Sequence, residues 1–342
     1  MSNYKSLALA LVLMVTSAFA EQVTLKDGHP DHYVVKKGDT LWDISDMFLN
    51  SPWLWPEIWY ANPQVSNPHL IYPGDELTLV YVDGQPRLQI SRRGQRTVKL
   101  SPRARAESLD NAIPTIPLDA IQQFLSKPLV VGENELANAA YVVSSAGEHL
   151  ITGAGDHIYL RGIKDEASRG YNLFRPGDTY TDPDSGEILG YEAIYLGEGN
   201  VTRPGDPTTI KLTHTTREIN IGDRSLPMPE ETAQPYFKPH AADSALEGTI
   251  ISVLDGVTQI GQYQVIVINR GKRENVDVGT VFAVEQAGEL IRDQVSPKHE
   301  LVKLPNERAG LMMVFRTFDK VSYGLVLKAT QALHVGDKVV AP

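Results

Sequence analysis

The sequence predicts a multidomain protein, in which a small α+β unit of βααβ order precedes a mainly β region made of two related small β-barrel or β-sandwich modules. Three observations predict this class. Residues 32–80 combine strand and helix patterns, and from residue 128 onward short Val, Ile, Tyr and Leu runs are separated by Gly, Asp and Pro turns. In addition, two stretches of the β-rich region resemble each other. At 342 residues the chain is long enough for two or three domains.

The first twenty residues have the pattern of a secretory signal peptide. Lys5 is followed by an apolar run over residues 7–15 and by "SAFA", which places Ala18 and Ala20 at the small-residue positions. We therefore expect residues 1–20 to be removed and the protein to be exported. The apolar run is too short to span a bilayer permanently, and no other segment approaches eighteen apolar residues. The sequence thus predicts no direct membrane anchor.

Composition excludes several classes of function. The chain has no cysteine, which excludes disulfides, thiolate metal sites, cysteine nucleophiles and a lipid-modified N-terminal cysteine. With 32 basic and 42 acidic residues, the formal net charge is −10. That balance argues against general binding to polyanions, so no nucleic-acid partner is expected.

Residues 32–80 form the first predicted unit. "HYVVKKGD" indicates a short strand that ends in a Gly-Asp turn. Thr40 suits a helix N-cap, with Asp43 at the third helical position as an acidic variant of the capping box. "LWDISDMFL" then has the spacing of an amphipathic helix, and "WLWPEIWYAN" indicates a second short helix. A loop rich in Pro and Asn leads into "LTLVYV", the closing strand.

Residues 83–127 are interpreted as a basic linker that contains a short helix. Between Arg87 and Arg105 there are seven basic residues and no acidic one. The run is typical of a solvated face. The alternative is an electrostatic contact, centred on Arg92, Arg93 and Arg96, with an acidic partner or with peptidoglycan carboxylates. "IPTIPLDAIQQFL" then predicts a short helix that begins at Pro117.

The β-rich remainder divides into module 1 (residues 128–227), a polar linker (228–243) and module 2 (244–342). The stretch that ends at Gly162 resembles the stretch that ends at Gly271, and both regions close on a strand with a Gly-Asp turn. These parallels indicate an internal duplication, although strand–turn pairs also resemble one another by chance. "TDPDSGEI" predicts a hairpin turn, and the Gly-Asp pairs at 177–178, 222–223 and 336–337 predict turns between strands.

The βααβ unit resembles a LysM domain over essentially its full length. The residues that match the family pattern are Gly38, Asp39, Thr40, Leu41, Asn62, Pro63, Asn67, Pro68, Leu70, Ile71, Tyr72, Pro73 and Gly74. The resemblance implies binding of glycans that contain N-acetylglucosamine, chiefly peptidoglycan, in a shallow groove. One wall of that groove would be Gly38, Asp39, Thr40 and Leu41, and the other would be Pro68, His69, Leu70 and Ile71. The alternative is that Leu41, Leu70 and Ile71 are simply core residues.

All four tryptophans, at positions 42, 53, 55 and 59, lie in this same unit. They could form a platform on which sugars stack. The interpretation that we favour is that a domain of about fifty residues without disulfides needs large apolar side chains to fill its core.

No catalytic motif is found in the sequence. The nine histidines give no H-x-H or H-E-x-x-H spacing, and there is no G-x-S-x-G elbow and no phosphate-binding loop. The sequence therefore predicts a non-catalytic protein with no cofactor and no metal site.

The mature chain as a whole is similar to the type IV pilus secretin-associated proteins (the TsaP family), whose C-terminal part is similar to a flagellar T-ring protein domain. The segments that carry this resemblance are "FRPGDTYTDPDSGEILGYEAIYLGEG" and "GTIISVLDGVTQIGQYQVIVINRG…VDVGTVF". The resemblance implies a periplasmic protein, associated with peptidoglycan and the outer membrane, that links an outer-membrane secretin ring to the cell wall. It also implies several copies around the ring. The alternatives are a LysM-bearing scaffold of another envelope machine and a wall-remodelling enzyme with an unrecognised β domain.

Overall fold

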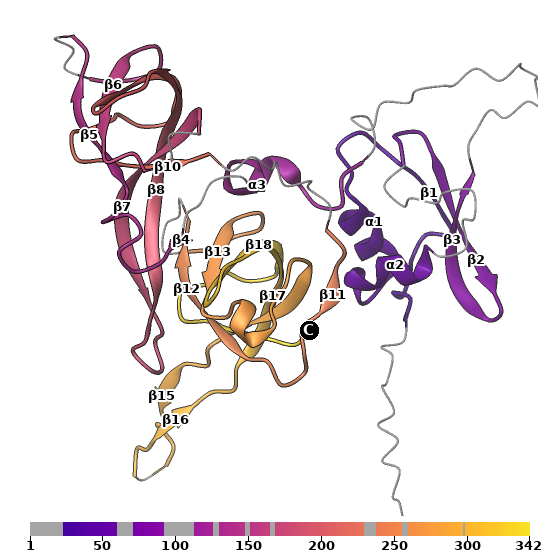
Figure 1. Cartoon of the computed structure of the whole chain (residues 1–342). Coiled ribbons are helices and arrows are strands. Elements are labelled where there is room, and N and C mark those ends of the chain that lie inside the picture. Colours follow the sequence, from indigo (N-terminus) through magenta and orange to yellow (C-terminus); the bar gives the residue numbers. More distant parts are fainter. Residues whose placement is uncertain are drawn as a thin grey trace, which may run out of the picture.

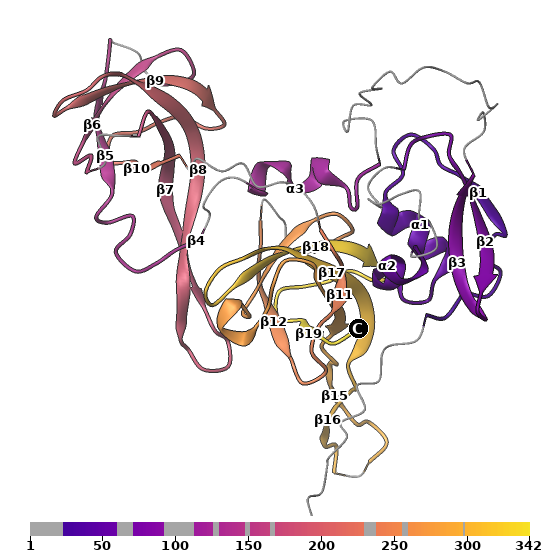
Figure 2. The same cartoon turned by 45° about the vertical axis from the view of Figure 1, so that its right-hand side comes forward.

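The computed structural model describes residues 23–59, 71–91, 113–125, 130–147, 151–164, 168–228, 237–254, 259–296 and 298–342. The predicted signal peptide, residues 1–20, lies outside these ranges. Figure 1 shows module 2 in the centre, with the N-terminal unit on one side and module 1 on the other. Figure 2 confirms that helix α3 (Leu118–Leu125) lies above module 2, between its two neighbours.

The N-terminal unit contains three strands and two short helices, in agreement with the predicted α+β class. The elements are β1 (His32–Val34), α1 (Leu41–Phe48), the 3₁₀ turn η1 (Pro52–Leu54), α2 (Trp55–Ile58), β2 (Glu76–Val82) and β3 (Gln85–Ser91), with sheet order β1-β2-β3. Thr40 is the N-cap of α1, as predicted. Its hydroxyl accepts the Asp43 N–H at 3.1 Å and donates to the Asp43 carboxylate at 2.7 Å.

Strand β3 differs from the sequence prediction, which placed the start of a basic linker at residue 83. The strand pairs with β2 along its whole length, from Gln85 to Ser91. Leu88 and Ile90 alternate with polar residues and are buried against the N-terminal unit. The basic residues of this segment obscured that alternation, because only the inward positions carry the strand signal.

Module 1 is a closed ring of six antiparallel strands. These are β5 (Ala140–Ser145), β6 (His157–Arg161), β7 (Gly170–Thr181), β8 (Ile188–Arg203), β9 (Thr208–Thr215) and β10 (Arg224–Pro227). The pairings run β8-β7-β10-β5-β6-β9 and close through β8 and β9. The short strand β4 (Val130–Val131) adds to the outer side of β8.

Module 2 repeats this connectivity. Its ring consists of β12 (Gly248–Val253), β13 (Val265–Ile268), β14 (Thr280–Gln286), β17 (Glu307–Thr317), β18 (Ser322–Ala329) and β19 (Lys338–Val340). In both modules the third strand is followed around the ring by the fourth, fifth, second, first and sixth. The two related β modules that the sequence predicts are therefore closed barrels rather than sandwiches.

Three further elements of module 2 lie outside its ring. Strand β11 (His240–Ala241) adds to β14, so module 2 begins before residue 244 and the end of the predicted linker at 228–243 belongs to it. The segment η3 (Lys272–Glu274) is a 3₁₀ turn. The hairpin of β15 (Leu290–Arg292) and β16 (Leu301–Lys303) projects away from the barrel, as Figures 1 and 2 both show.

Five turns in the described residues share one construction, at 36–39, 72–75, 153–156, 220–223 and 334–337. In each, the third residue is a glycine with φ between +92° and +101°, a conformation that other residues adopt at a cost. The carboxylate of the final aspartate accepts the N–H of the first residue. The turns predicted at 222–223 and 336–337 are thus confirmed.

The turn predicted at Gly177 and Asp178 is wrong. Both residues lie inside β7, where the register with β8 shifts between Pro176 and Thr179. The Asp178 N–H donates to the Glu192 carboxylate of β8 rather than closing a turn. The pair therefore forms a bulge within a long strand.

Strands β13, β17 and β18 of module 2 are largely buried on both faces, because one apolar cluster lies inside the barrel and another covers part of its outside. In β13, Ile266 and Ile268 point into the barrel core, whereas Val265 and Val267 belong to the outer cluster. We call the outer one the central cluster. It joins all parts of the chain, and its members include Trp42, Trp53, Ile116, Ile121, Phe124, Tyr180, Leu189, Val265, Val267, Met313, Phe315, Tyr323 and Leu325.

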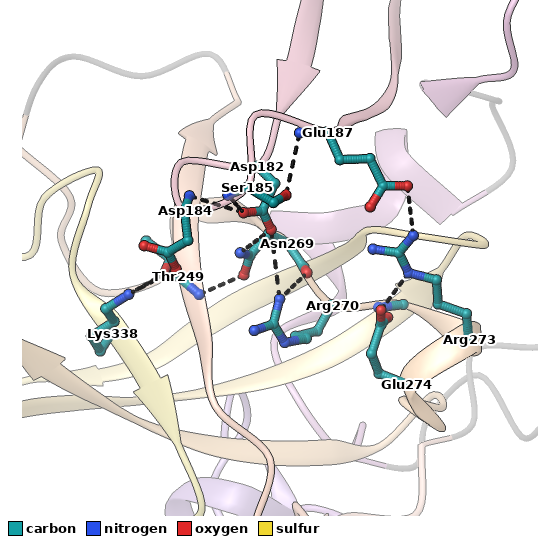
Figure 3. A network of polar contacts seen from close by, with 11 residues as sticks. Asp182, Asp184, Ser185, Glu187, Thr249, Asn269, Arg270, Arg273, Glu274 and Lys338 are labelled. Atoms are coloured by element: carbon teal, nitrogen blue, oxygen red, sulfur yellow. Dashed lines mark hydrogen bonds and ion pairs between the residues drawn. The ribbon is translucent and has the colours of Figure 1, made fainter.

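A network of polar contacts joins the turn of the β7–β8 hairpin to module 2, beside the central cluster (Figure 3). The sequence predicted this hairpin turn correctly. We call the contact between the hairpin and module 2 the junction. Asp182 accepts the N–H groups of Asp184 and Ser185, each at 2.9 Å, and the Asn269 side-chain amide of module 2 at 2.8 Å. Burial raises the pKa of Asp182, but these hydrogen bonds outweigh it and hold the pKa below its ordinary value. Glu187 pairs with both Arg273 and Lys320 at 2.7 Å.

Replacing Asp182 tests the junction. We expect Asp182→Ala to lower the free energy of unfolding by about 1–3 kcal/mol, because it leaves the buried Asn269 amide without its acceptor. The control is Asp184→Ala, two residues away, which removes an exposed 3.4 Å pair with Lys338 and should cost at most about 0.5 kcal/mol. Urea unfolding followed by circular dichroism measures both. Equal losses for the two variants would contradict the assignment.

Acid should weaken the same junction. The hydrogen bonds from Arg273 and Lys320 lower the pKa of Glu187 from 4.5 to about 2. The unfolded chain therefore binds a proton first, so stability falls as pH falls from about 4.5 toward about 2. Glu187→Gln should flatten that part of the profile of melting temperature against pH. Glu289→Gln, at an exposed position away from the junction, should leave the profile unchanged, and a flattened profile there would argue against a specific role of Glu187.

Candidate functional site

The first wall of the expected groove is the turn at 36–39 together with the start of α1. Gly38 is exposed at the tip, with φ +96°. The Asp39 carboxylate is held by the Tyr33 hydroxyl at 2.9 Å and by the Lys36 N–H at 2.8 Å. Burial and the hydrogen bond to Asp39 raise the pKa of Tyr33 to about 12. Asp39 is thus fixed in place by its own turn.

Three other predicted groove residues have buried side chains. Thr40 and Leu41 are 3% and 2% exposed, and Ile71 is fully buried. Leu41 and Ile71 belong to the core of the N-terminal unit, so of the two interpretations weighed for them the core one describes their side chains. What these residues present at the groove is backbone, namely the N–H groups at the start of α1 and the carbonyl of Ile71.

Residues 113–116 connect the two walls. Leu41 donates its N–H to the carbonyl of Pro114 at 2.9 Å, and Trp42 donates to the carbonyl of Thr115 at 3.0 Å. Across the groove, the Ile113 N–H donates to the carbonyl of Ile71 at 2.8 Å. We call residues 113–116 the strap. It occupies the N–H of Leu41 in the first predicted wall, the N–H of the adjacent Trp42, and the carbonyl of Ile71 in the second predicted wall.

Sequence analysis did not identify the strap as part of this site. The available signal was "IPTIP", in which Ile113 and Ile116 each precede a proline and are biased toward extended backbone. An extended segment satisfies few hydrogen bonds internally, so its carbonyls need partners elsewhere. The partner could not be named from the sequence, because the strap begins 65 residues after the end of α1.

The four tryptophans are all buried, between 1% and 6% exposed, which supports the core interpretation over a sugar-stacking platform. They do not all fill the same core, however. Trp55 and Trp59 lie in the core of the N-terminal unit, whereas Trp42 and Trp53 belong to the central cluster. Half of the tryptophans therefore hold the N-terminal unit to module 2 and α3.

Several predicted site residues lie outside the described residues. These are Pro68, His69 and Leu70 of the second wall, and Arg92, Arg93 and Arg96 of the basic run. Arg87, at the start of that run, is described, and its guanidinium donates to the carbonyl of Glu57 within the N-terminal unit.

The described residues contain no group of three or more His, Asp or Glu side chains that could hold a metal ion. No helix among them is long and apolar enough to cross a bilayer. An open pocket of about 360 Å³ lies on module 1, and its lining includes Glu133, Lys164 and Tyr171.

Comparison with known proteins agrees with the geometry of the N-terminal unit. No curated protein matches the sequence. The LysM domain family matches residues 33–80, which contain α1, the turn at 36–39 and Ile71. LysM domains are binding modules for N-acetylglucosamine-containing glycans such as peptidoglycan, which supports a carbohydrate-binding role for this part of the chain. Residues 33–80 are therefore a LysM domain.

Proposed function

We propose that this protein is a non-catalytic periplasmic anchor, in which the LysM domain binds peptidoglycan and the β modules hold the secretin ring of a type IV pilus. The observation that carries the peptidoglycan half is the LysM match over residues 33–80. The secretin half is supported by the similarity of the barrel segments to secretin-associated proteins. The leader-like residues 1–20 support export.

An anchor must transmit load between its two attachments, and the LysM domain is suited to this because it is not loosely tethered. Trp42 and Trp53 are buried against module 2 and α3 in the central cluster. Lys328 of β18 pairs with Asp46 of α1 at 3.0 Å. Tension on the barrels therefore reaches the LysM domain through packed side chains as well as through the backbone.

A single shallow glycan groove binds weakly, with dissociation constants on the order of micromolar to millimolar. Copies arranged around a ring would raise the effective concentration of grooves at the wall and convert weak contacts into firm attachment. Arg92, Arg93 and Arg96 would add electrostatic contacts with peptidoglycan carboxylates or with an acidic partner.

Binding to purified sacculi tests the peptidoglycan half. We expect the mature chain to sediment with sacculi, soluble N-acetylglucosamine oligomers to release it, and no soluble muropeptides to appear. Gly38→Ala should weaken sedimentation, because a Cβ at φ +96° strains the groove wall. Gly336→Ala makes the same change in the equivalent turn of module 2, at φ +101°, and should sediment normally.

If the wild-type chain does not sediment with sacculi, the anchor proposal is wrong. Release of soluble muropeptides would instead indicate a wall-remodelling enzyme. Affinity purification from detergent-extracted outer membranes tests the secretin half, which predicts that secretin is recovered with the chain. Recovery of a different envelope complex would identify a scaffold of another machine.

A further inference from the structure

We propose that the strap is an internal ligand of the LysM groove, so that glycan binding requires the strap to leave. This inference rests on the proposed glycan-binding function. The strap makes hydrogen bonds to both walls at 2.8–3.0 Å, and these bonds use the Leu41 and Trp42 N–H groups and the Ile71 carbonyl. A groove occupied in this way is closed to another ligand that needs the same groups.

The strap imitates the ligand in chemical terms. The acetamido group of N-acetylglucosamine offers one carbonyl acceptor and one N–H donor. The strap offers both kinds of group, since the carbonyls of Pro114 and Thr115 accept from the N–H groups of α1 and the Ile113 N–H donates to the Ile71 carbonyl. Since each backbone N–H donates one good hydrogen bond, strap and glycan compete for these donors.

The sequence of the strap favours its binding to α1 and Ile71. Ile113 and Ile116 precede Pro114 and Pro117, which biases both toward extended backbone, and Pro114 has no N–H that would need an acceptor. Little conformational freedom is therefore lost when the strap binds. Ile113 is 5% exposed in the LysM core, and Ile116 is fully buried in the central cluster.

The strap is also tied to the β modules, which makes its release responsive to their position. Its last residue, Ile116, is followed by Pro117 and α3, and Arg316 of β17 donates to the Phe124 carbonyl in the last turn of α3 at 2.8 Å. A displacement of α3 relative to the LysM domain pulls on the strap. Glycan binding would therefore depend on how the barrels are arranged relative to the LysM domain.

Amide hydrogen exchange on the full chain tests the strap directly. Pro114→Gly should loosen it and make the Leu41 and Trp42 amides exchange about two- to fivefold faster. The Ile44 and Leu49 amides, which bond within the same LysM domain, should be unchanged and so report that α1 remains folded. Pro305→Gly, the same replacement at an exposed site near the projecting hairpin, should alter none of these amides.

Titration with a soluble N-acetylglucosamine oligomer tests the competition. If the strap is seated in about 90% of molecules, the apparent dissociation constant is about ten times the intrinsic one. Pro114→Gly should then bind about two- to fivefold more tightly than the wild type or Pro305→Gly. Equal affinity, with the Leu41 and Trp42 amides released, would overturn the proposal.

The wild-type chain provides a measurement that does not depend on how a variant folds. At saturating oligomer, the Ile113 amide should lose protection because the strap has left the groove. Continued protection of Ile113 with glycan bound would overturn the competition. If neither the wild type nor Pro114→Gly binds the oligomer, the glycan function itself fails, and the exchange data still report whether the strap is seated.

Discussion

The structure depends on a single constraint, which is that the outer face of the module 2 barrel is as apolar as its interior. Strands β13, β17 and β18 carry nearly continuous runs such as "VIVI" and "LMMVF", so both of their faces must be removed from water. The central cluster does this by recruiting Trp42 and Trp53, α3 and the β7–β8 hairpin. The placement of the LysM domain and of module 1 follows from this requirement.

Two barrels of the same connectivity therefore have different surfaces. In module 1, strands such as β5 and β6 alternate between buried and more exposed positions, which is the pattern of a sheet with one solvated face. In module 2, β13 is buried at every position. Among the described residues, the projecting β15–β16 hairpin is also open to solvent, since its strand residues are all exposed.

Local features were predictable from the sequence because each is decided within a few residues. The Thr40 N-cap, the hairpin turn after Asp182 and the helix after Pro117 all follow from side chains that bond or restrict the adjacent backbone. The bulge at Gly177, strand β3 and the packing of Trp42 were not predictable in this way. Each depends on a partner that is distant in the sequence, and an apolar side chain does not specify which apolar surface will cover it.

The strap depends both on its local sequence and on contacts that are distant in the sequence. The two Ile-Pro pairs bias its backbone locally, whereas its position is fixed by distant contacts at both ends. Ile113 is anchored in the LysM core and Ile116 in the central cluster, only three residues along the chain. A segment of three residues can span at most about 10 Å. The LysM core and the central cluster are therefore coupled through this short segment, and a change that separates the LysM domain from module 2 also strains the backbone bonds of the strap to Leu41, Trp42 and Ile71.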